Sequence, residues 1–372
     1  MHSYLIVTAK PGRQIPAHVL RLLDEPSPAT VPFDVDDHTS WRDRTGTMAF
    51  GGWQAATEVL GIGSHWSITP AGLTAFSGLP LPRSDRWAPD RPWAAQLADR
   101  LASSHKALEE LCGLFSVASL HDDGRGWIAS DPLGLSLLYV AEDADVVAVS
   151  TRAGLAARAV TPPGREPERD LETVASLVYL SFALGERTGY TAARTLPQGA
   201  TVELEPGRGA TIRRSSGSPW WPEEAIGSLG VDEAVAAIRA DLAANVRATA
   251  LVDAPRRSIE LTGGKDSRLL LAMILQEDLT DRFVTATWGP PHIPDRVVAA
   301  ELLELCGLGD RVPIVRGQGS PRAGTAAAGS AGAPGSRVSR GTAPPPDPPY
   351  LAKLAHHVWL TEGALSTWDL RL

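Results

Sequence analysis

The stretch Thr262-Gly263-Gly264-Lys265-Asp266-Ser267 stands between a short run typical of a strand, residues 257–261, and a run typical of a helix, residues 268–277. Two glycines allow the backbone to turn tightly and to approach a ligand closely. The first N–H groups of a helix have no acceptor within the helix, so they point into the turn and favour an anion. This order of elements predicts a loop that binds phosphate groups.

The polar side chains of this loop point to a nucleotide or pyrophosphate with Mg²⁺. Thr262 and Ser267 offer hydroxyl groups, and we expect Ser267 to cap the helix. Asp266 would repel a phosphate, so its presence predicts a divalent cation between the carboxylate and the phosphates. Lys265 either contacts phosphate or is a solvated lysine in a turn. The alternative for the whole hexapeptide is a plain Gly-Gly turn before a buried helix.

The loop differs from the Walker P-loop. That motif requires a glycine five residues before its Gly-Lys pair and a serine or threonine after the lysine. Ile259 and Asp266 occupy those two positions here.

Bulk composition excludes several classes of function. The 372 residues suffice for two domains, and the net charge of −8 argues against general binding to nucleic acid or to an anionic membrane. The two cysteines, Cys112 and Cys306, lie in apolar stretches, which predicts buried thiols in a reducing cytosol and no cysteine-based zinc site. The longest apolar run, Val174 to Leu184, is too short to span a membrane, and no secretion signal precedes it. These features predict a cytoplasmic protein.

The first part of the chain, residues 1–205, has the pattern of antiparallel sheets. Short apolar runs are separated by Gly, Pro and Asp, and the clearest cover residues 114–118, 126–129, 137–140, 146–149 and 201–204. Two helices are expected, one over residues 93–112 and one over residues 170–184 with Asp170 as its cap. Asp131 is expected to fix a tight turn with Pro132 and Gly134.

The pattern changes after a boundary near residue 225. Helical spacing is found over residues 231–251, 268–277 and 294–306, and strand-like runs cover residues 257–261, 283–288 and 312–315. Such alternation predicts a parallel, doubly wound sheet whose ligands lie at the carboxyl ends of the strands. The loop with Gly263 and Gly264 falls at such an end. We expect Asp295 to cap its own helix.

Residues 316–349 interrupt this second domain, residues 225–372. They are dominated by Gly, Ala, Ser, Pro and Arg and cannot bury enough apolar surface to form a core. The stretch is either a linker or a frame-shifted translation of a GC-rich gene. Residues 350–372 again have helical spacing. The adjacent His356 and His357 would face different sides of a helix, so a metal site is not expected there. Glu362 either faces the active cleft or, as is more common for a lone glutamate on a helix, is solvated.

Two sets of motifs, in order, resemble the asparagine synthetase (glutamine-hydrolysing) family, which includes β-lactam synthetases and lasso-peptide cyclases. The hexapeptide is similar to the Ser-Gly-Gly-x-Asp-Ser loop of the ATP pyrophosphatase superfamily, with Thr262 in place of the first serine. The resemblance covers residues of about 40 to 315 and 350 to 372. Its other motifs lie at residues 113–116, 129–134, 138–139, 150–155, 195–199, 287–289, 294–295, 357–359, 362–363 and 366–369.

The resemblance implies an α+β, Ntn-hydrolase-like (glutaminase-type) sandwich followed by an α/β ATP pyrophosphatase-type domain. It implies an asparagine synthase-like ligase that adenylates a carboxylate with ATP, releases AMP and pyrophosphate, and forms an amide when an amine attacks. ATP and Mg²⁺ would be the cofactors. Thr262 through Ser267 would bind the phosphates, and Asp266 would contact the Mg²⁺ that is bound to them. The partners would be a small-molecule or peptide carboxylate and an amine donor, without nucleic acid or membrane.

Two departures from the family keep alternatives open. The family's glutaminase uses an N-terminal cysteine as nucleophile, whereas this chain begins Met1-His2-Ser3, so we expect no glutamine hydrolysis. The resemblance implies that members without that cysteine join an amine within the substrate, as in β-lactam or lasso-peptide cyclisation, or use a free amine, instead of ammonia from glutamine. The family's downstream pyrophosphate loop and catalytic residues are also missing, which suggests a truncated chain. A catalytically inactive fragment is therefore the third hypothesis, and no catalytic residue is assigned.

Overall fold

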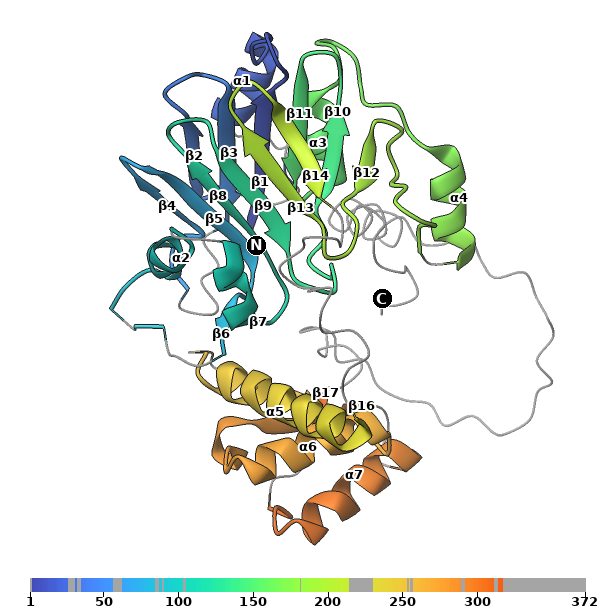
Figure 1. Cartoon of the computed structure of the whole chain (residues 1–372). Helices are drawn as coiled ribbons and strands as arrows, with labels where there is room; N and C mark the ends of the chain where they lie inside the picture. Colours follow the sequence, from blue (N-terminus) through green and yellow to red (C-terminus); the bar gives the residue numbers. More distant parts are fainter. Residues whose placement is uncertain are drawn as a thin grey trace, which may run out of the picture.

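The computed structural model describes residues 2–25, 31, 35–55, 62–83, 87–88, 90–102, 105–180, 182–213, 230–252, 254, 257–288, 292–310 and 314–316. Figure 1 shows a large sandwich of two sheets formed by the first part of the chain and a smaller unit of helices and strands formed by the second.

The first sheet of the sandwich has six strands in the order β12-β10-β11-β1-β3-β2, and all neighbours whose pairing is defined are antiparallel. Its central strand β1 is apolar on both faces. The strands are β1 His2–Ala9, β2 Asp37–Arg42, β3 Met48–Gln54, β10 Tyr139–Glu142, β11 Val146–Ser150 and β12 Ala193–Thr195.

The second sheet also has six strands, in the order β14-β13-β9-β8-β5-β4, and its neighbours are again antiparallel. A short pair, β6 with β7, lies outside it. The strands are β4 Trp66–Thr69, β5 Gly72–Gly78, β6 Leu81–Pro82, β7 Leu111–Cys112, β8 Phe115–His121, β9 Gly126–Ser130, β13 Thr201–Glu205 and β14 Gly209–Arg213.

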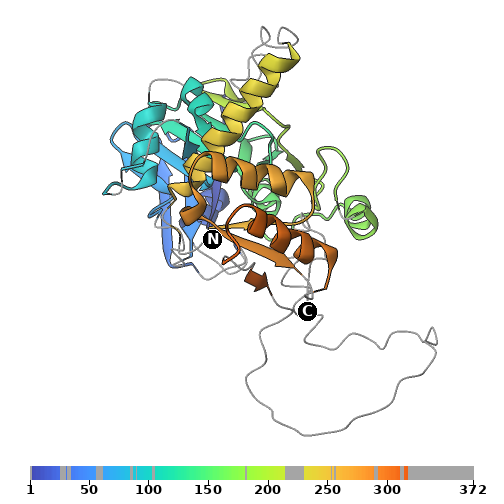
Figure 2. The same ribbon diagram turned by 90° about the horizontal axis from the view of Figure 1, so that it is seen from below.

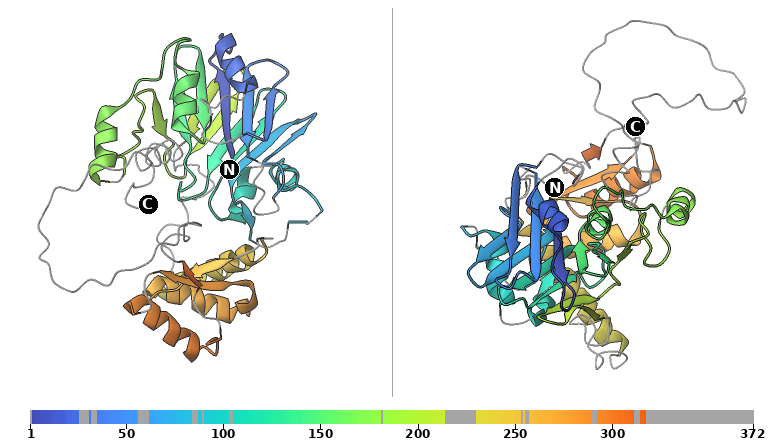
Figure 3. Two further views of the ribbon diagram at one scale, coloured as in Figure 1. Left: turned by 180° about the vertical axis from the view of Figure 1, so that it is seen from behind. Right: turned by 90° about the horizontal axis from the view of Figure 1, so that it is seen from above.

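The two sheets pack face to face, and helices cover their outer faces (Figure 3). Tyr4 and Ile6 of β1 join the core between the sheets, whereas the alternating Leu5 and Val7 join the core on the helical side, as the two-residue period of a strand requires. The Tyr4 hydroxyl bridges the sheets to the Ser116 hydroxyl at 2.8 Å. The helices are α1 Ala17–Asp24, α2 Trp93–Leu101, η1 His105–Glu110, α3 Ala153–Ala159 and α4 Leu171–Leu180.

The smaller unit is built on a parallel sheet of three strands in the order β15-β16-β17. Leu261, at the end of β15, packs against Leu271 of α6 and against Ala299 and Leu303 of α7, so these two helices cover the same face. The elements are α5 Val231–Ala250, β15 Ser258–Glu260, α6 Lys265–Gln276, η3 Thr280–Arg282, β16 Val284–Trp288, α7 Pro294–Leu305 and β17 Ile314–Arg316.

Helix α5 connects the two units. Its Ala248, together with Val252 just after it, joins the apolar cluster of α2, and its Asp241 pairs with Arg83 Nη1 at 2.5 Å. On another side α5 packs along α6 (Figure 2), where Val246 contacts the cluster of Met273 and Ile274.

The expected antiparallel strands of the first part are confirmed, with ends shifted by up to three residues. The helix expected over residues 93–112 is wrong in length, because α2 ends at Leu101 and Leu111–Cys112 instead pair with Leu81–Pro82 as strands. The helix expected to reach residue 184 ends at Leu180. Its cap is confirmed, since Asp170 Oδ1 accepts the N–H of Thr173 at 3.1 Å. The second sheet extends to Arg213, because β14 pairs with β13 in a hairpin.

The alternating elements and parallel pairing expected for the second part are confirmed from residue 231 to residue 316. Within the described residues α6 and α7 lie on one face, and Ser258 and Glu260 on the other face of β15 are exposed. The doubly wound arrangement therefore stays a prediction. Residues 317–349 of the low-complexity stretch, and residues 350–372 with His356, His357 and Glu362, lie outside the described residues. Among the helices that are described, none has the length and apolar character needed to cross a bilayer.

Candidate functional site

The hexapeptide of Thr262 to Ser267 lies at the carboxyl end of β15, where a parallel sheet places its ligands. Leu261 anchors the loop from below, because its side chain is fully buried and its N–H donates to the Ala286 carbonyl at 2.8 Å. Lys265 and Asp266 are exposed, so the loop is open to solvent above this anchor. The expected position of the loop is thus confirmed.

Two hydroxyl groups fix the shape of the loop. Ser267 Oγ accepts the N–H of Thr262 at 3.1 Å, and Thr262 Oγ1 accepts the N–H of Gly264 at 3.1 Å. The expectation that Ser267 caps α6 is wrong, since the helix begins at Lys265 and Gly264 occupies the cap position. Ser267 lies in the first turn, where its hydroxyl can reach back to the loop instead.

The start at Lys265 leaves donors for an anion. The main-chain N–H groups of Lys265, Asp266 and Ser267 precede the first intrahelical bond, which Arg268 donates to the Gly264 carbonyl at 3.3 Å. These amides and the positive end of the α6 dipole face the loop. The geometry suits a phosphate group, and the carboxylate of Asp266 in the same turn suits a cation beside it.

The role predicted for Asp295 from the sequence is wrong. Its Oδ1 accepts the N–H of Gly263 at 3.3 Å, across the gap between α7 and the loop. It was expected to cap its own helix, but Ile293 holds the cap position and Pro294 opens the first turn. The signal that could have found it is topological: α7 follows the carboxyl end of β16, which is the neighbour of the strand that carries the loop.

A buried hydroxyl lies at the same edge of the sheet. Thr287 on β16 is fully buried, and its Oγ1 has no hydrogen-bond partner among the described residues. Thr285, two residues earlier on the same face, lines a small apolar cavity with Leu271 and Leu303, so this face is the one under α6 and α7. Thr287 therefore lies beneath that layer, toward the carboxyl end of β16. Clusters of three or more metal-binding side chains are absent from the described part of the chain.

The start of β1 is filled by aromatic rings. His2 stacks on His65 with ring centroids 3.8 Å apart, and His65 lies 4.9 Å from Phe76. His65 Nδ1 contacts Gln54 Oε1 at 3.0 Å, while His2 Nε2 is buried without a partner in the described structure. Burial lowers the pKa of His2 well below its usual range and lowers the pKa of His65 to about 4, so both rings are neutral at pH 7.

The cysteines lie away from this ring stack. Cys112 is buried in β7, where burial raises the pKa of its thiol, and Cys306 is half-buried after α7. Neither belongs to β1. The expected turn at Asp131 is confirmed, since its carboxylate accepts the N–H groups of Leu133, Leu135 and Ser136.

We predict that the protein releases no glutamate from glutamine. Strand β1 offers a ring stack in place of a thiolate, and the thiol form of Cys112 is favoured by burial. Incubation with glutamine should give glutamate at the rate of the buffer control. Release above that control, abolished by a thiol-alkylating reagent, would contradict the prediction.

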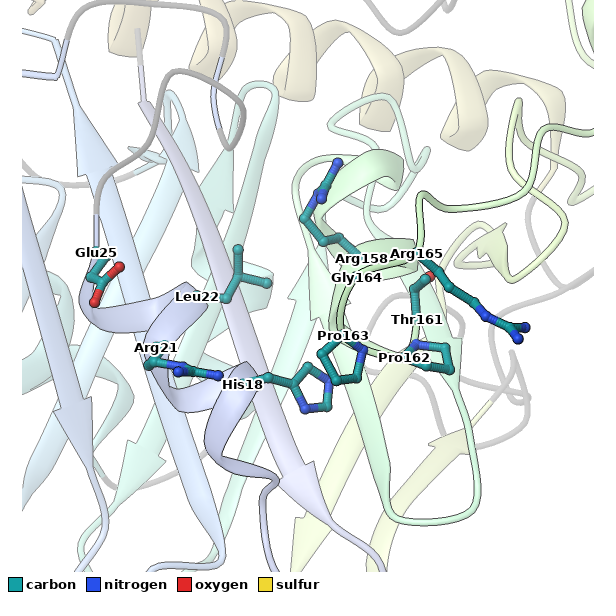
Figure 4. Close-up of a pocket in the computed structure, with 10 residues that line it drawn as sticks. All are labelled: His18, Arg21, Leu22, Glu25, Arg158, Thr161, Pro162, Pro163, Gly164 and Arg165. Atoms are coloured by element: carbon teal, nitrogen blue, oxygen red, sulfur yellow. The ribbon is translucent and has the colours of Figure 1, made fainter.

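A surface groove of about 440 Å³ lies between α1 and the segment after α3. Figure 4 shows Arg21 pointing toward His18, whereas Arg158 and Arg165 point away from one another. Arg158 is also neutralised by Glu166 at 2.6 Å. The groove therefore lacks a converging set of donors, unlike the loop at residue 263.

Comparison with solved structures finds similarity to a glutamine phosphoribosylpyrophosphate amidotransferase from B. subtilis complexed with ADP and GMP. The identity is 13%, the TM-score is 0.33, and the match covers 57% of this chain and 49% of that chain. A structure described as the allosteric regulatory enzyme of purine biosynthesis matches with 13% identity, a TM-score of 0.36 and the same coverage, 57% and 49%.

This chain spans about half the length of those two proteins. No protein-family model matches it. No curated protein matches it.

Proposed function

We propose that this protein is an ATP-dependent, AMP-forming amide ligase of the asparagine synthetase type, with an Ntn-hydrolase-like first domain and an ATP pyrophosphatase-type second domain. The observation that carries the proposal is the loop of Thr262 to Ser267 at the carboxyl end of a parallel strand, with the first-turn amides of α6 and Asp266 in one turn. The two-layer antiparallel sandwich before it supports the order of domains.

In the proposed reaction a carboxylate oxygen of the substrate attacks the α-phosphorus of ATP, and the bond to pyrophosphate breaks. An amine then attacks the acyl carbon, the carbon–oxygen bond breaks, AMP leaves, and the nitrogen loses a proton to solvent. The amides of α6 and the loop stabilise the charge that develops on the departing pyrophosphate. Thr262 and Ser267 keep that loop in shape, as their mutual contact at 3.2 Å supports. Bound Mg²⁺ would neutralise phosphate charge, with Asp266 as its protein ligand.

The source of the amine separates two forms of this function. The ring stack of His2 and His65 at the start of β1 favours an amine other than ammonia from glutamine. Ring closure within one substrate, as in β-lactam synthetases and lasso-peptide cyclases, is therefore the second candidate. In either form the partners are a carboxylate and an amine, and the cofactors are ATP and Mg²⁺.

We predict that Asp266→Ala weakens binding of ATP in the presence of Mg²⁺ by about tenfold or more, because the variant loses the carboxylate that faces the cation. Without Mg²⁺ the two proteins should differ much less. The measurement is calorimetric titration of the full chain with ATP, with and without Mg²⁺. Asp310→Ala, which removes an exposed carboxylate after the far end of α7, is the matched control. Equal affinity of wild type and Asp266→Ala for ATP with Mg²⁺ would reject the assignment.

A further inference from the structure

The contact between Asp295 and Gly263 occupies an amide of the loop. A loop that binds phosphate needs its amides free, yet the Gly263 N–H is taken by Asp295 Oδ1 at 3.3 Å. The carboxylate comes from α7, a separate element that is 32 residues away along the chain. It thus lies where an anionic ligand would accept the same hydrogen bond.

Steric crowding does not explain why residue 263 is a glycine. A Cβ added at Gly263 would meet Val298 Cγ1 at 3.5 Å and Asp295 Oδ1 at 3.7 Å, which are ordinary contact distances. The residue has no positive φ. A side chain could therefore be accommodated at this position in ordinary contact with Val298 and Asp295, so the glycine is not required by crowding.

The hydrogen bond itself is of the kind that a ligand can replace. Its length of 3.3 Å exceeds the usual 2.9 to 3.0 Å of an N–H···O bond. Asp295 is exposed on the first turn of α7, so its side chain can rotate away into solvent without leaving a buried charge.

A second, independent observation at this edge also points to a ligand. The Thr287 hydroxyl, on the face of β16 under α6 and α7, is fully buried and has no partner among the residues that the structure describes. An unsatisfied buried hydroxyl is costly, and a ligand or a bound water at the carboxyl end of the sheet would satisfy it.

We propose that Asp295 is a positioning residue of the nucleotide loop: its carboxylate holds the Gly263 amide in the free protein and yields it to a phosphate when nucleotide binds. This inference rests on the proposed function of the loop. Without a cation, the carboxylate and the phosphates compete for one amide and repel each other. Bound Mg²⁺ would neutralise phosphate charge, so the repulsion between the displaced carboxylate and the phosphate would be weaker. Asp295 therefore makes binding depend on Mg²⁺.

The test is calorimetric titration of the full chain with inorganic pyrophosphate, with and without Mg²⁺, for wild type and Asp295→Asn. Asparagine keeps the shape and removes the charge. Without Mg²⁺ the variant should bind pyrophosphate about tenfold more tightly than wild type. The gain in affinity on adding Mg²⁺ should shrink by about tenfold in the variant. Asp310→Asn, with the same loss of charge on an exposed carboxylate, should behave as wild type.

The outcomes distinguish failure of this inference alone from failure of the function on which it rests. If wild type and Asp295→Asn bind pyrophosphate equally, with the same gain from Mg²⁺, Asp295 has no role at the loop, while the function of the loop stands. If neither protein binds pyrophosphate under any condition, both the inference and the proposed function are overturned. Asp295 is exposed, so loss of folding is not expected, and Asp295→Ser provides a second neutral variant with the same expected result.

Discussion

Replacement of Phe50 by alanine is expected to lower the free energy of unfolding by about 3–5 kcal/mol. Phe50 on β3 is fully buried in the core between the two sheets, where its ring stacks on Tyr4 with centroids 6.1 Å apart. Truncation would remove this ring from a core whose walls are strands fixed by their ladders. The cavity could close only in part, which is why the loss would be near the upper range for core substitutions.

The matched control is Phe182→Ala. Phe182 is 55% exposed, so the same truncation should cost less than about 1 kcal/mol. Urea denaturation of both variants, followed by tryptophan fluorescence, gives the two free energies. Equal losses in the two variants would show that the core between the sheets does not hold Phe50 as described.

Acid should destabilise the first domain through His65. Burial lowers the pKa of His65 from 6.5 to about 4 in the folded protein. Below pH 6.5 His65 takes up a proton in the unfolded chain but stays neutral in the folded chain. The contribution of His65 to the free energy of unfolding is therefore complete above pH 6.5 and is lost as the pH falls toward 4. Because a tenfold difference in proton affinity corresponds to about 1.4 kcal/mol, the loss is about 3 kcal/mol, and partial exposure of the ring reduces it to about 2–3 kcal/mol.

The variant His65→Phe tests this origin of the acid sensitivity. Phenylalanine keeps a ring between His2 and Phe76 but cannot take up a proton. The fall in unfolding free energy between pH 7.5 and pH 4.5 should be clearly smaller in this variant, with a remainder from His2, whose pKa burial also lowers. His292→Phe, at an exposed position, is the control. An unchanged pH slope in His65→Phe would mean that other groups cause the acid sensitivity.

Local pattern predicted most of the secondary structure, because period and turn residues are local properties. The runs near residues 115, 126, 146 and 201 became strands, and the helix expected over residues 294–306 ends at Leu305, two residues before Gly307 with its φ of 71°. The loop at Gly263 was predicted for the same reason, since a strand, two glycines and a helix start are adjacent in the chain.

Local sequence pattern could not predict the contacts between residues that lie far apart in the chain. Asp295 follows Ile293 and Pro294 and has the local look of a capping residue, yet it contacts Gly263 because β16 pairs in parallel with β15. The stack of His2 on His65 likewise depends on the packing of β1 against other strands. Neither contact has a signal within a window of ten residues.

The central position of β1 has a consequence for biosynthesis. Its partners are β3 and β11, and Leu5 pairs with both Gly51 and Ser150. At the usual rate of translation, about 5–20 residues per second, Ser150 is made about 7 to 30 s after the first strand. During that interval the newly made, strongly apolar β1 has at most one of its two neighbours, so the nascent chain is expected to need protection by a chaperone until β11 emerges from the ribosome.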